Sequence, residues 1–383
     1  MSRVDELIKK LCPDGVVFEE IGAVVEIKNG KDWKTERPGK IPVFGSGGQM
    51  DVYVQEASCV GPSVLLPRKG SLAVQFVDAP FWNVDTVFYT KCNPEQLDIK
   101  YFYYVMERVD LSRISTSSTR PSITQTALKK LVIPVPPLEI QLEIARILDK
   151  FTQLEAELEA ELEARRKQSA YFRDQFFDHD SPFYKASVLG KVGEFRRGSS
   201  FQKKHIVKAG IPCIHYGEIY THYGISAKET KSYLASEFAE NKRLMEPGEV
   251  FIATTSENDE DLGKAVAWIG AEPVVPSNDG FVYSPVREQL DPQYVSYFLS
   301  SGNFQNQKRK HVTGAKVRRL SKRALESIEI PLPPLEEQRR IVAILDKFDA
   351  LVNDISTGLP AEIAARRKQY EYYRDKLLSF EPV

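Results

Sequence analysis

The stretch IPVPPLEIQLEIARILDKF, residues 133–151, occurs a second time as IPLPPLEEQRRIVAILDKF at residues 330–348. Each copy leads to an ARRKQ sequence, at residues 164–168 and 365–369, and then to a related ending, YFRDQFF or YYRDKLL. A repeat of this length indicates that the chain contains the same structural unit twice.

Each copy predicts a long helix that packs along another helix. The Pro-Pro pair favours an extended segment followed by a helix start. Apolar residues then recur at alternating steps of four and three, which is the spacing of a coiled-coil seam. Because both copies share this spacing, we expect the two helices to pack on each other, antiparallel. The predicted packing residues are Ile144, Ile147, Phe151, Leu154, Leu158, Ile341, Ile344, Phe348, Leu351 and Ile355. Two unrelated amphipathic helices, each on its own domain, are the alternative.

The first helix is predicted to run from about Glu139 to Phe177, a spacer of roughly 60 Å. The second copy has four additional residues before its ARRKQ sequence. Such an insertion interrupts a heptad pattern. Gly358 and Pro360 lie in it, so we expect the second helix to break near residues 358–360.

The composition is that of an ordinary globular protein of two or more domains, with 383 residues, 42% hydrophobic and 27% charged. A net charge of −1 does not by itself indicate a nucleic-acid binder. No apolar run approaches the ~20 residues of a membrane span, and the start MSRVDELIKKL has no signal-peptide core, so we expect a cytoplasmic protein. The four Cys form no CxxC pair and the five His show no ligand spacing, so no metal site is predicted.

Two globular regions flank the repeated stretches. Their short runs of Val, Ile and Phe, separated by Gly and Pro, favour strands. IKNG at residues 27–30 is similar to FRRG at 195–198, and NVD at 83–85 is similar to SND at 277–279. We therefore predict an α+β fold with pseudo-two-fold organisation, in which two mixed, strand-rich domains alternate with two long helices. The predicted parts are residues 1–137, 138–180, 181–334 and 335–383.

Three groups of polar and basic loops are candidates for DNA contact. They follow the first strand of each region, precede each long helix, or contain the TTSEN sequence at residues 254–258. Lys and Arg suit phosphate contacts, whereas Arg, Asn and Ser also form hydrogen bonds with base edges. A solvated basic surface is the alternative for each loop. The candidate residues are Lys28, Asn29, Lys31, Lys34, Ser117, Arg120, Arg196, Arg197, Lys203, Lys204, Thr255, Asn258, Lys316, Arg318 and Arg319.

With these motifs in view, the chain resembles the DNA-specificity subunit of type I restriction–modification systems. The resemblance rests on IPxPPLExQ, ILDKF, ARRKQ and YxRD, present twice, and covers the full length. It implies that each globular region is a target-recognition domain that reads half of a split duplex site. It also implies that the helices set the spacing and dock two methyltransferase (modification) subunits, which motor-nuclease (restriction) subunits join. S-adenosylmethionine, ATP and Mg are then cofactors of the partners, and this chain binds none.

Independently of the resemblance, two different reading domains on a rigid helix pair suit two different half-sites, ~34–36 Å apart for one helical turn. The predicted target is therefore bipartite and asymmetric.

Catalytic motifs are lacking in the sequence. It has no Asn/Asp-Pro-Pro-aromatic motif and no P-loop, and GSGG at residues 45–48 is not a GxGxxG loop. Pro13-Asp14 with Glu26 and Lys28 matches a PD…ExK nuclease only by a pattern that chance easily produces. We therefore expect a non-catalytic subunit. The alternative function is a coiled-coil adaptor between proteins, and salt-dependent binding to duplex DNA separates the two.

Overall fold

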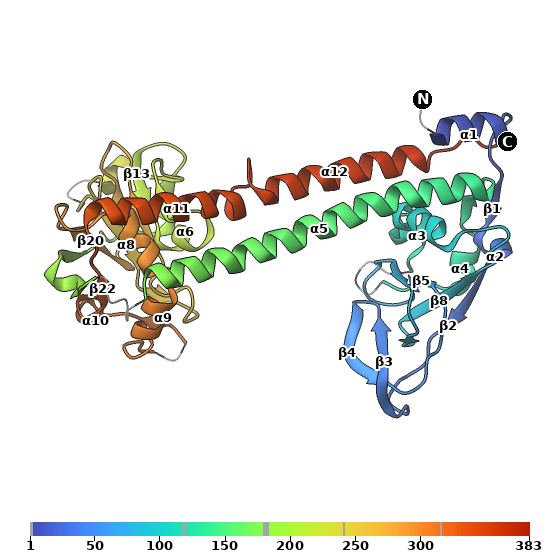
Figure 1. Ribbon diagram of the computed structural model, residues 1–383, viewed down its shortest axis with the longest axis horizontal. Coiled ribbons are helices and arrows are strands. Elements are labelled where there is room, and N and C mark those ends of the chain that lie inside the picture. Colours follow the sequence, from blue (N-terminus) through green and yellow to red (C-terminus); the bar gives the residue numbers. More distant parts are fainter. Residues whose placement is uncertain (1–2, 117–118, 120, 179–183, 240–241, 315) are drawn as a thin grey trace. The chain divides into compact units, whose positions relative to one another are not determined.

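The computed structural model describes residues 3–116, 119, 121–178, 184–239, 242–314 and 316–383. The chain forms two compact units (Figure 1). Unit 1 consists of Met1–Glu159 and Glu362–Val383, and unit 2 is Ala160–Ala361. Each unit thus combines one globular domain with the first part of the helix that follows it and the last part of the helix from the other copy.

The globular domain of unit 1 contains short helices and nine strands among its described residues. The helices are α1 (Arg3–Leu11), α2 (Ile21–Val24), α3 (Ile99–Arg108) and α4 (Gln125–Lys129). The strands are β1 (Phe18–Glu20), β2 (Val25–Asn29), β3 (Pro38–Gly45), β4 (Gly48–Val54), β5 (Ser63–Pro67), β6 (Gln75–Val77), β7 (Trp82–Asn83), β8 (Val87–Cys92) and β9 (Val132–Pro134).

The globular domain of unit 2 is built in the same way but is larger. Its helices are α6 (Tyr216–Thr221), α7 (Ser236–Ala239), α8 (Pro292–Leu299), α9 (Gly302–Lys308) and α10 (Lys322–Glu326). Its strands are β10 (Ala186–Val188), β11 (Gly193–Arg197), β12 (Ile206–Val207), β13 (Ile211–Ile214), β14 (Ser226–Ala227), β15 (Ser232–Leu234), β16 (Val250–Ala253), β17 (Thr255–Ser256), β18 (Ala265–Trp268), β19 (Val275–Pro276), β20 (Gly280–Pro285), β21 (Arg318–Arg319) and β22 (Glu329–Pro331).

The two domains share a sheet topology. The main sheet has the order β2-β8-β5-β6 in unit 1 and β11-β20-β16-β18-β14 in unit 2. A second sheet contains one parallel pair in each unit, β3 with β7 and β13 with β19. A two-stranded ladder then joins the start of each domain to the segment before its long helix, β1 with β9 and β10 with β22. The predicted α+β fold with two related, strand-rich domains is confirmed.

Two glycines confirm the weak sequence match between the domains. Gly30 and Gly198 both lie directly against the backbone of a neighbouring segment: a Cβ on either would approach a carbonyl oxygen, of Val84 or Ser277, to 2.0 Å. Only glycine permits this close approach. Because Val84 and Ser277 belong to the matched NVD and SND sequences, these loops occupy equivalent positions.

The long helices are α5 (Leu138–Phe176), α11 (Leu335–Asn353) and α12 (Leu359–Leu377). The second copy is interrupted between α11 and α12, in the segment with the additional residues. None of the helices in the described parts of the chain has the length and apolar character needed to cross a membrane.

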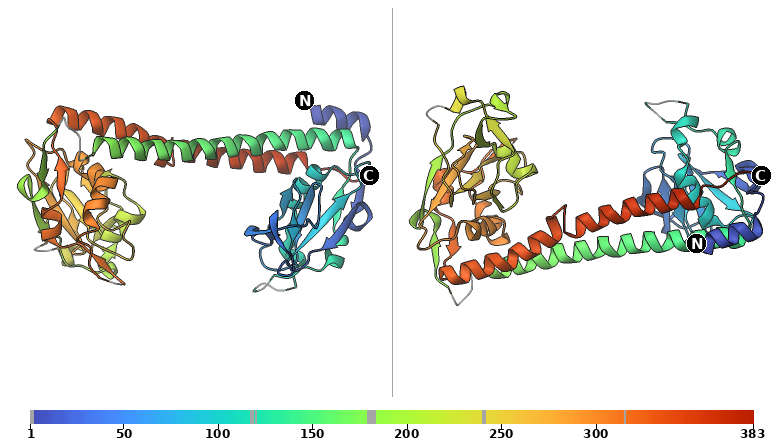
Figure 2. Two further views of the ribbon diagram at one scale, coloured as in Figure 1. Left: turned by 60° about the horizontal axis from the view of Figure 1, so that its bottom comes forward. Right: turned by 90° about the horizontal axis from the view of Figure 1, so that it is seen from above.

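The helices run antiparallel within each unit, as the views in Figure 2 show for α12 and the first half of α5. In unit 1, Phe151 stacks on Tyr373 with ring centroids 5.5 Å apart, and farther along α5 the Arg367 guanidinium contacts Glu155 and Glu159. In unit 2, Phe172 stacks on Phe348 at the same distance. Aromatic rings at equivalent positions therefore join the two helices in both units.

The predicted packing seam is only partly observed. Ile144 and Ile341 are buried, but in the cores of the globular domains. Ile147, Ile344 and Leu158 are half-buried. The prediction is wrong for Ile355, which lies outside both helices and is 86% exposed. Leu154 and Leu351 are also exposed. The globular domains, and not the partner helix, bury the first turns of α5 and α11.

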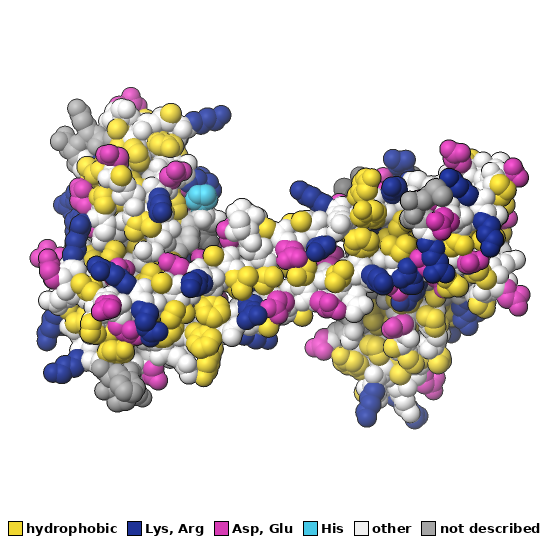
Figure 3. All heavy atoms as spheres, turned by 45° about the horizontal axis from the view of Figure 1, so that its top comes forward, with side chains coloured by type: hydrophobic (Ala, Val, Ile, Leu, Met, Phe, Trp, Pro, Cys, Tyr) yellow, Lys and Arg dark blue, Asp and Glu magenta, His cyan; other side chains and the backbone are white. Residues whose placement is uncertain are grey.

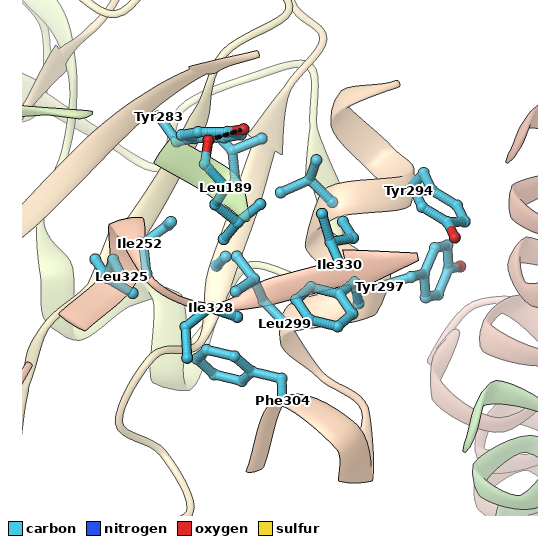
Figure 4. Close-up of a cluster of buried hydrophobic side chains, with 14 of the residues drawn as sticks. Leu189, Ile252, Tyr283, Tyr294, Tyr297, Leu299, Phe304, Leu325, Ile328 and Ile330 are labelled. Carbon is cyan, nitrogen blue, oxygen red and sulfur yellow. Dashed lines mark hydrogen bonds between the residues drawn. The ribbon is translucent and has the colours of Figure 1, made fainter. Parts of the chain in front are cut away.

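Each domain is fixed to its helix by the same polar contacts. Tyr101 and Tyr294, from α3 and α8, donate to the carbonyls of Pro134 and Pro331 at 3.1 Å. Three residues farther along each helix, Tyr104 and Tyr297 donate to Asp149 and Asp346 at 2.7 Å. Figure 4 shows Tyr294 and Tyr297, which belong to the buried cluster of unit 2 together with Leu299, Phe304, Ile328 and Ile330.

Candidate nucleic-acid interface

In unit 2, loops from distant parts of the sequence meet at one end of the main sheet. β11 and β16 are both antiparallel to β20, so their last residues and the first residues of β20 lie at the same end. Beyond this end, the Thr254 N–H donates to the Asp279 carbonyl at 3.1 Å. We call the described residues 197–200, 254–258, 276–279 and 313–319 the recognition edge of unit 2.

Two arginines stand at the centre of this edge. β21 pairs with β17, so that Arg319 lies opposite Thr255. Arg318 forms an ion pair with Asp259 at 3.1 Å and donates to the Gly314 carbonyl at 2.7 Å. Arg319 is exposed. This part of the edge therefore presents one oriented and one exposed guanidinium group, the side chains best suited to phosphate and guanine.

The equivalent end of the unit 1 sheet is built from β2, β5 and β8. The Lys31 N–H donates to the Asn83 carbonyl at 3.0 Å, and the Arg68 N–H donates to the Thr86 carbonyl at 2.9 Å. The backbone of Lys69 pairs with that of Ser122, from the loop before the long helix, in an isolated antiparallel β-bridge. We call the described residues 29–34, 68–70, 83–86, 116 and 121–122 the recognition edge of unit 1.

Most predicted candidates that the structure describes lie at these two edges. They are Asn29, Lys31, Lys34, Arg197, Thr255, Asn258, Lys316, Arg318 and Arg319. Lys203 and Lys204 are exposed in a 3-10 turn next to the unit 2 edge. Lys28 lies within β2, paired with Glu26 at 3.2 Å. Ser117 and Arg120 lie outside the described residues.

The side chains of two candidate residues form hydrogen bonds with other residues of unit 2. The Arg196 guanidinium donates to both carboxylate oxygens of Glu249 and to the Ser284 hydroxyl. Glu249 is only 11% exposed, so this ion pair is part of the domain and gives Arg196 a structural role. The Asn258 amide likewise donates to the Asp261 carboxylate and accepts from the Asp261 N–H, which orders the loop.

Sequence reasoning missed Arg68 and Lys69. They follow the fully buried strand β5, as residues 254–258 follow β16, and the apolar run SVLLP directly before a basic pair was the available signal. In the structure the Arg68 guanidinium lies 5.9 Å from the Phe88 ring and donates to the Asp85 carbonyl at 3.2 Å. Lys69 is exposed.

Acidic and basic side chains are intermixed on one face of the molecule. On the face shown in Figure 3, Lys and Arg side chains alternate with Asp and Glu. Among the described residues, no group of three or more His, Cys, Asp or Glu has a metal-binding arrangement. Burial raises the pKa of the Cys92 and Cys213 thiols to about 12, which makes these thiols unreactive at neutral pH.

The family follows from comparison with known proteins. Residues 13–164 and 184–365 each match the family "Type I restriction modification DNA specificity domain". The chain belongs to this family. This specificity subunit is 33% identical over 299 residues to the specificity subunit of the type I restriction enzyme EcoR124I/EcoR124II of Escherichia coli. The alignment covers 76% of this chain and 73% of the relative. A putative type I restriction enzyme specificity subunit of Haemophilus influenzae is 30% identical over 361 residues, 89% of each chain.

Solved structures agree with the fold of the specificity subunit. The crystal structure of a type I restriction–modification S subunit from M. genitalium has a TM-score of 0.58 at 17% identity, over 95% of this chain and 96% of that one. A chain from a structural study of complex assembly and conformational transition in the type I system has a TM-score of 0.59 at 16% identity, over 96% and 98%. The comparisons do not favour the adaptor alternative.

Proposed function

We propose that this specificity subunit directs a type I restriction–modification complex to DNA, in the cytoplasm, by reading a bipartite and asymmetric duplex sequence. Each domain reads one half-site with its recognition edge. The observation that carries the proposal is the equivalence of the two edges, which occupy the same end of two homologous sheets. Because they present different side chains at equivalent positions, Lys69 in unit 1 and Thr255 in unit 2, the half-sites differ in sequence.

The long helices set the distance between the half-sites and dock two modification subunits, and restriction subunits join the same complex. The family and the names of the relatives, which are subunits of restriction enzymes, support these partners. In this proposal the chain is not itself catalytic. S-adenosylmethionine serves the modification subunits, and ATP and Mg serve the restriction subunits.

Methylome sequencing tests the proposal in cells that carry the modification subunit with and without this chain. A bipartite asymmetric motif is expected only when the chain is present, and it reports both half-sites at once. An unchanged methylome, in cells where the complex is shown to assemble, would contradict sequence-specific DNA reading by this chain. It would instead support the alternative function of a coiled-coil adaptor between proteins.

A second experiment tests the non-catalytic role. The purified chain is incubated with cognate duplex and labelled S-adenosylmethionine, first alone and then with the modification subunit. Label transfer is expected only in the second mixture. Methylation by the chain alone would contradict the proposed division of labour.

A further inference from the structure

A small cavity of unit 2 lies between the second half of α5 and α11. Its volume is about 180 Å³, and Arg166, Ser169, Arg173 and Asp349 are among its lining residues. The Arg173 Nε is buried, and no hydrogen-bond partner for it exists among the described residues. A buried N–H without an acceptor has lost its hydration without compensation, so the group requires an explanation.

At the equivalent place in unit 1, a larger side chain fills the space and carboxylates neutralise the arginine charge. Arg367 and Tyr370 occupy the positions in the second copy that Arg166 and Ser169 have in the first. Arg367 forms ion pairs with Glu155 and Glu159 of α5. The Tyr370 hydroxyl donates to the Glu107 carboxylate. In unit 1, carboxylates of the same unit therefore supply the hydrogen-bond acceptors for Arg367 and Tyr370.

Unit 2 lacks these groups. Val352 and Ser356 occupy the positions in the second copy that Glu155 and Glu159 have in the first. Ser169 leaves unfilled the space that the Tyr370 ring takes in unit 1. Within the described part of unit 2, Arg166 forms no ion pair, although its neighbours Arg165 and Lys167 pair with Glu161 and Glu163. Two guanidinium groups thus line the cavity without the carboxylates that their unit 1 counterpart has.

We propose that this cavity binds a carboxylate side chain of a protein partner, held between Arg166 and Arg173. Guanidinium groups bind carboxylates through paired, charge-assisted hydrogen bonds, and such a contact supplies the acceptor that the Arg173 Nε lacks. The volume is below the ~300–1,000 Å³ of pockets for whole ligands, so it suits a single inserted Asp or Glu side chain.

A partner carboxylate fits this site better than a DNA phosphate. Asp349 lines the cavity, with its Oδ1 accepting from Asn353 at 2.7 Å. A backbone phosphodiester carries two sugar groups and is therefore bulkier than an inserted carboxylate side chain, which suits the small volume better. Carboxylates, not phosphates, also occupy the equivalent place in unit 1. The modification subunit is the partner inferred here, and this identity rests on the proposed function.

The experiment measures binding of the full-length chain to its modification subunit by titration calorimetry. Arg166→Met and Arg173→Met keep the aliphatic stems and remove the charges. Ser169→Tyr fills the cavity with the side chain that unit 1 has. Arg165→Met is the matched control, because Arg165 is paired with Glu161 and does not line the cavity. We expect each cavity variant to weaken binding at least tenfold, and the control to change it less than twofold.

Thermal unfolding of the same variants separates binding from folding. Since Arg173 Nε has no partner in the free chain, Arg173→Met is expected to leave the unfolding midpoint unchanged or higher. As a partner-free arm, sodium acetate is compared with sodium chloride at equal ionic strength. Acetate is expected to raise the midpoint of the wild type and not that of Arg173→Met.

The inference is overturned if all three cavity variants bind the modification subunit like the wild type, or if they weaken DNA binding alone. In either case the wild-type chain would still produce its methylome motif, and the proposed function would stand. A wild-type chain that does not assemble with the modification subunit would instead overturn both proposals.

Discussion

The backbone N–H of Asp98 donates a 2.8 Å hydrogen bond to the side-chain carbonyl of Gln141, a residue of α5 that is fully buried. The Gln141 amide in turn donates to the carbonyls of Gln96 and Pro136. In unit 2, Gln338 is equally buried and makes the same three contacts, with Asp291, Gln289 and Pro333. The Gln of the repeated PPLExQ sequence is therefore the residue that locks each recognition domain to its helix.

Replacing this glutamine by leucine is expected to destabilise its unit. Gln141→Leu leaves the Asp98 N–H and the carbonyls of Gln96 and Pro136 without this partner, which costs about 3 kcal/mol in total. Urea unfolding measures the loss. Gln153→Leu, at an exposed site of the same helix, is the control and is expected to change stability by less than about 0.5 kcal/mol. Equal stability of the two variants would contradict the locking role.

Arg196 and Arg197 are adjacent but are expected to behave differently. Arg196→Ala leaves the nearly buried Glu249 carboxylate unpaired and is expected to destabilise unit 2 by about 3 kcal/mol. Arg197 is exposed, so Arg197→Ala is expected to leave stability within about 0.5 kcal/mol and to weaken DNA binding. Thermal unfolding and duplex binding of both variants separate the two roles. A stable Arg196→Ala chain that has lost DNA binding would reverse this assignment.

Substitutions at the two recognition edges are expected to act on different half-sites. Arg318→Ala with Arg319→Ala is expected to weaken discrimination at the half-site read by unit 2, by about 1–3 kcal/mol for each base that an arginine no longer reads. Arg68→Ala with Lys69→Ala is the matched pair for unit 1. Methylation rates on duplexes with mutations in one half-site provide the measurement. An equal loss at both half-sites would indicate phosphate contacts alone.

The length of α5 is expected to control the unread spacer. Four residues inserted between Leu154 and Leu162 add about 6 Å of helix. This is on the order of two base-pair steps, at about 3.4 Å each. Methylome sequencing is expected to show a longer spacer between unchanged half-sites. New bases in the half-sites with an unchanged spacer would contradict the role of the helix as a spacer.

Lys308 predicts a pH dependence of stability. Its side chain is 1% exposed, and burial lowers its pKa to about 8, although Asp259 and Asp261 partly oppose the shift. Between pH 8 and 10.5 the unfolded chain binds more protons at this group than the folded chain, so the Lys308 contribution to stability rises with pH. Urea unfolding at pH 7.5 and 10 tests this. Lys308→Met is expected to lack this part of the rise, and identical pH profiles of the two proteins would contradict it.

The sequence by itself determined the features that depend on local pattern. The duplicated helix was predictable because heptad spacing, the Pro-Pro start and the ARRKQ ending repeat within short windows. The interruption near Gly358 has a local cause in the four additional residues. The basic character of the recognition loops was also visible, as was the match of Gly30 to Gly198, because a close backbone approach requires glycine at one position.

Only the tertiary structure decided the features that depend on contacts between distant residues. Arg196 forms an ion pair with Glu249, which lies 53 positions away in the sequence. No local pattern distinguishes Arg196 from Arg197. The apolar spacing extends to Ile355, but the chain leaves the helix after Asn353, so spacing alone overestimated the seam. Strand pairing brings Lys69 to Ser122 and Thr255 to Arg319, and this pairing creates the recognition edges. The physical reason is that a side chain becomes a ligand or a structural partner according to what the fold places beside it.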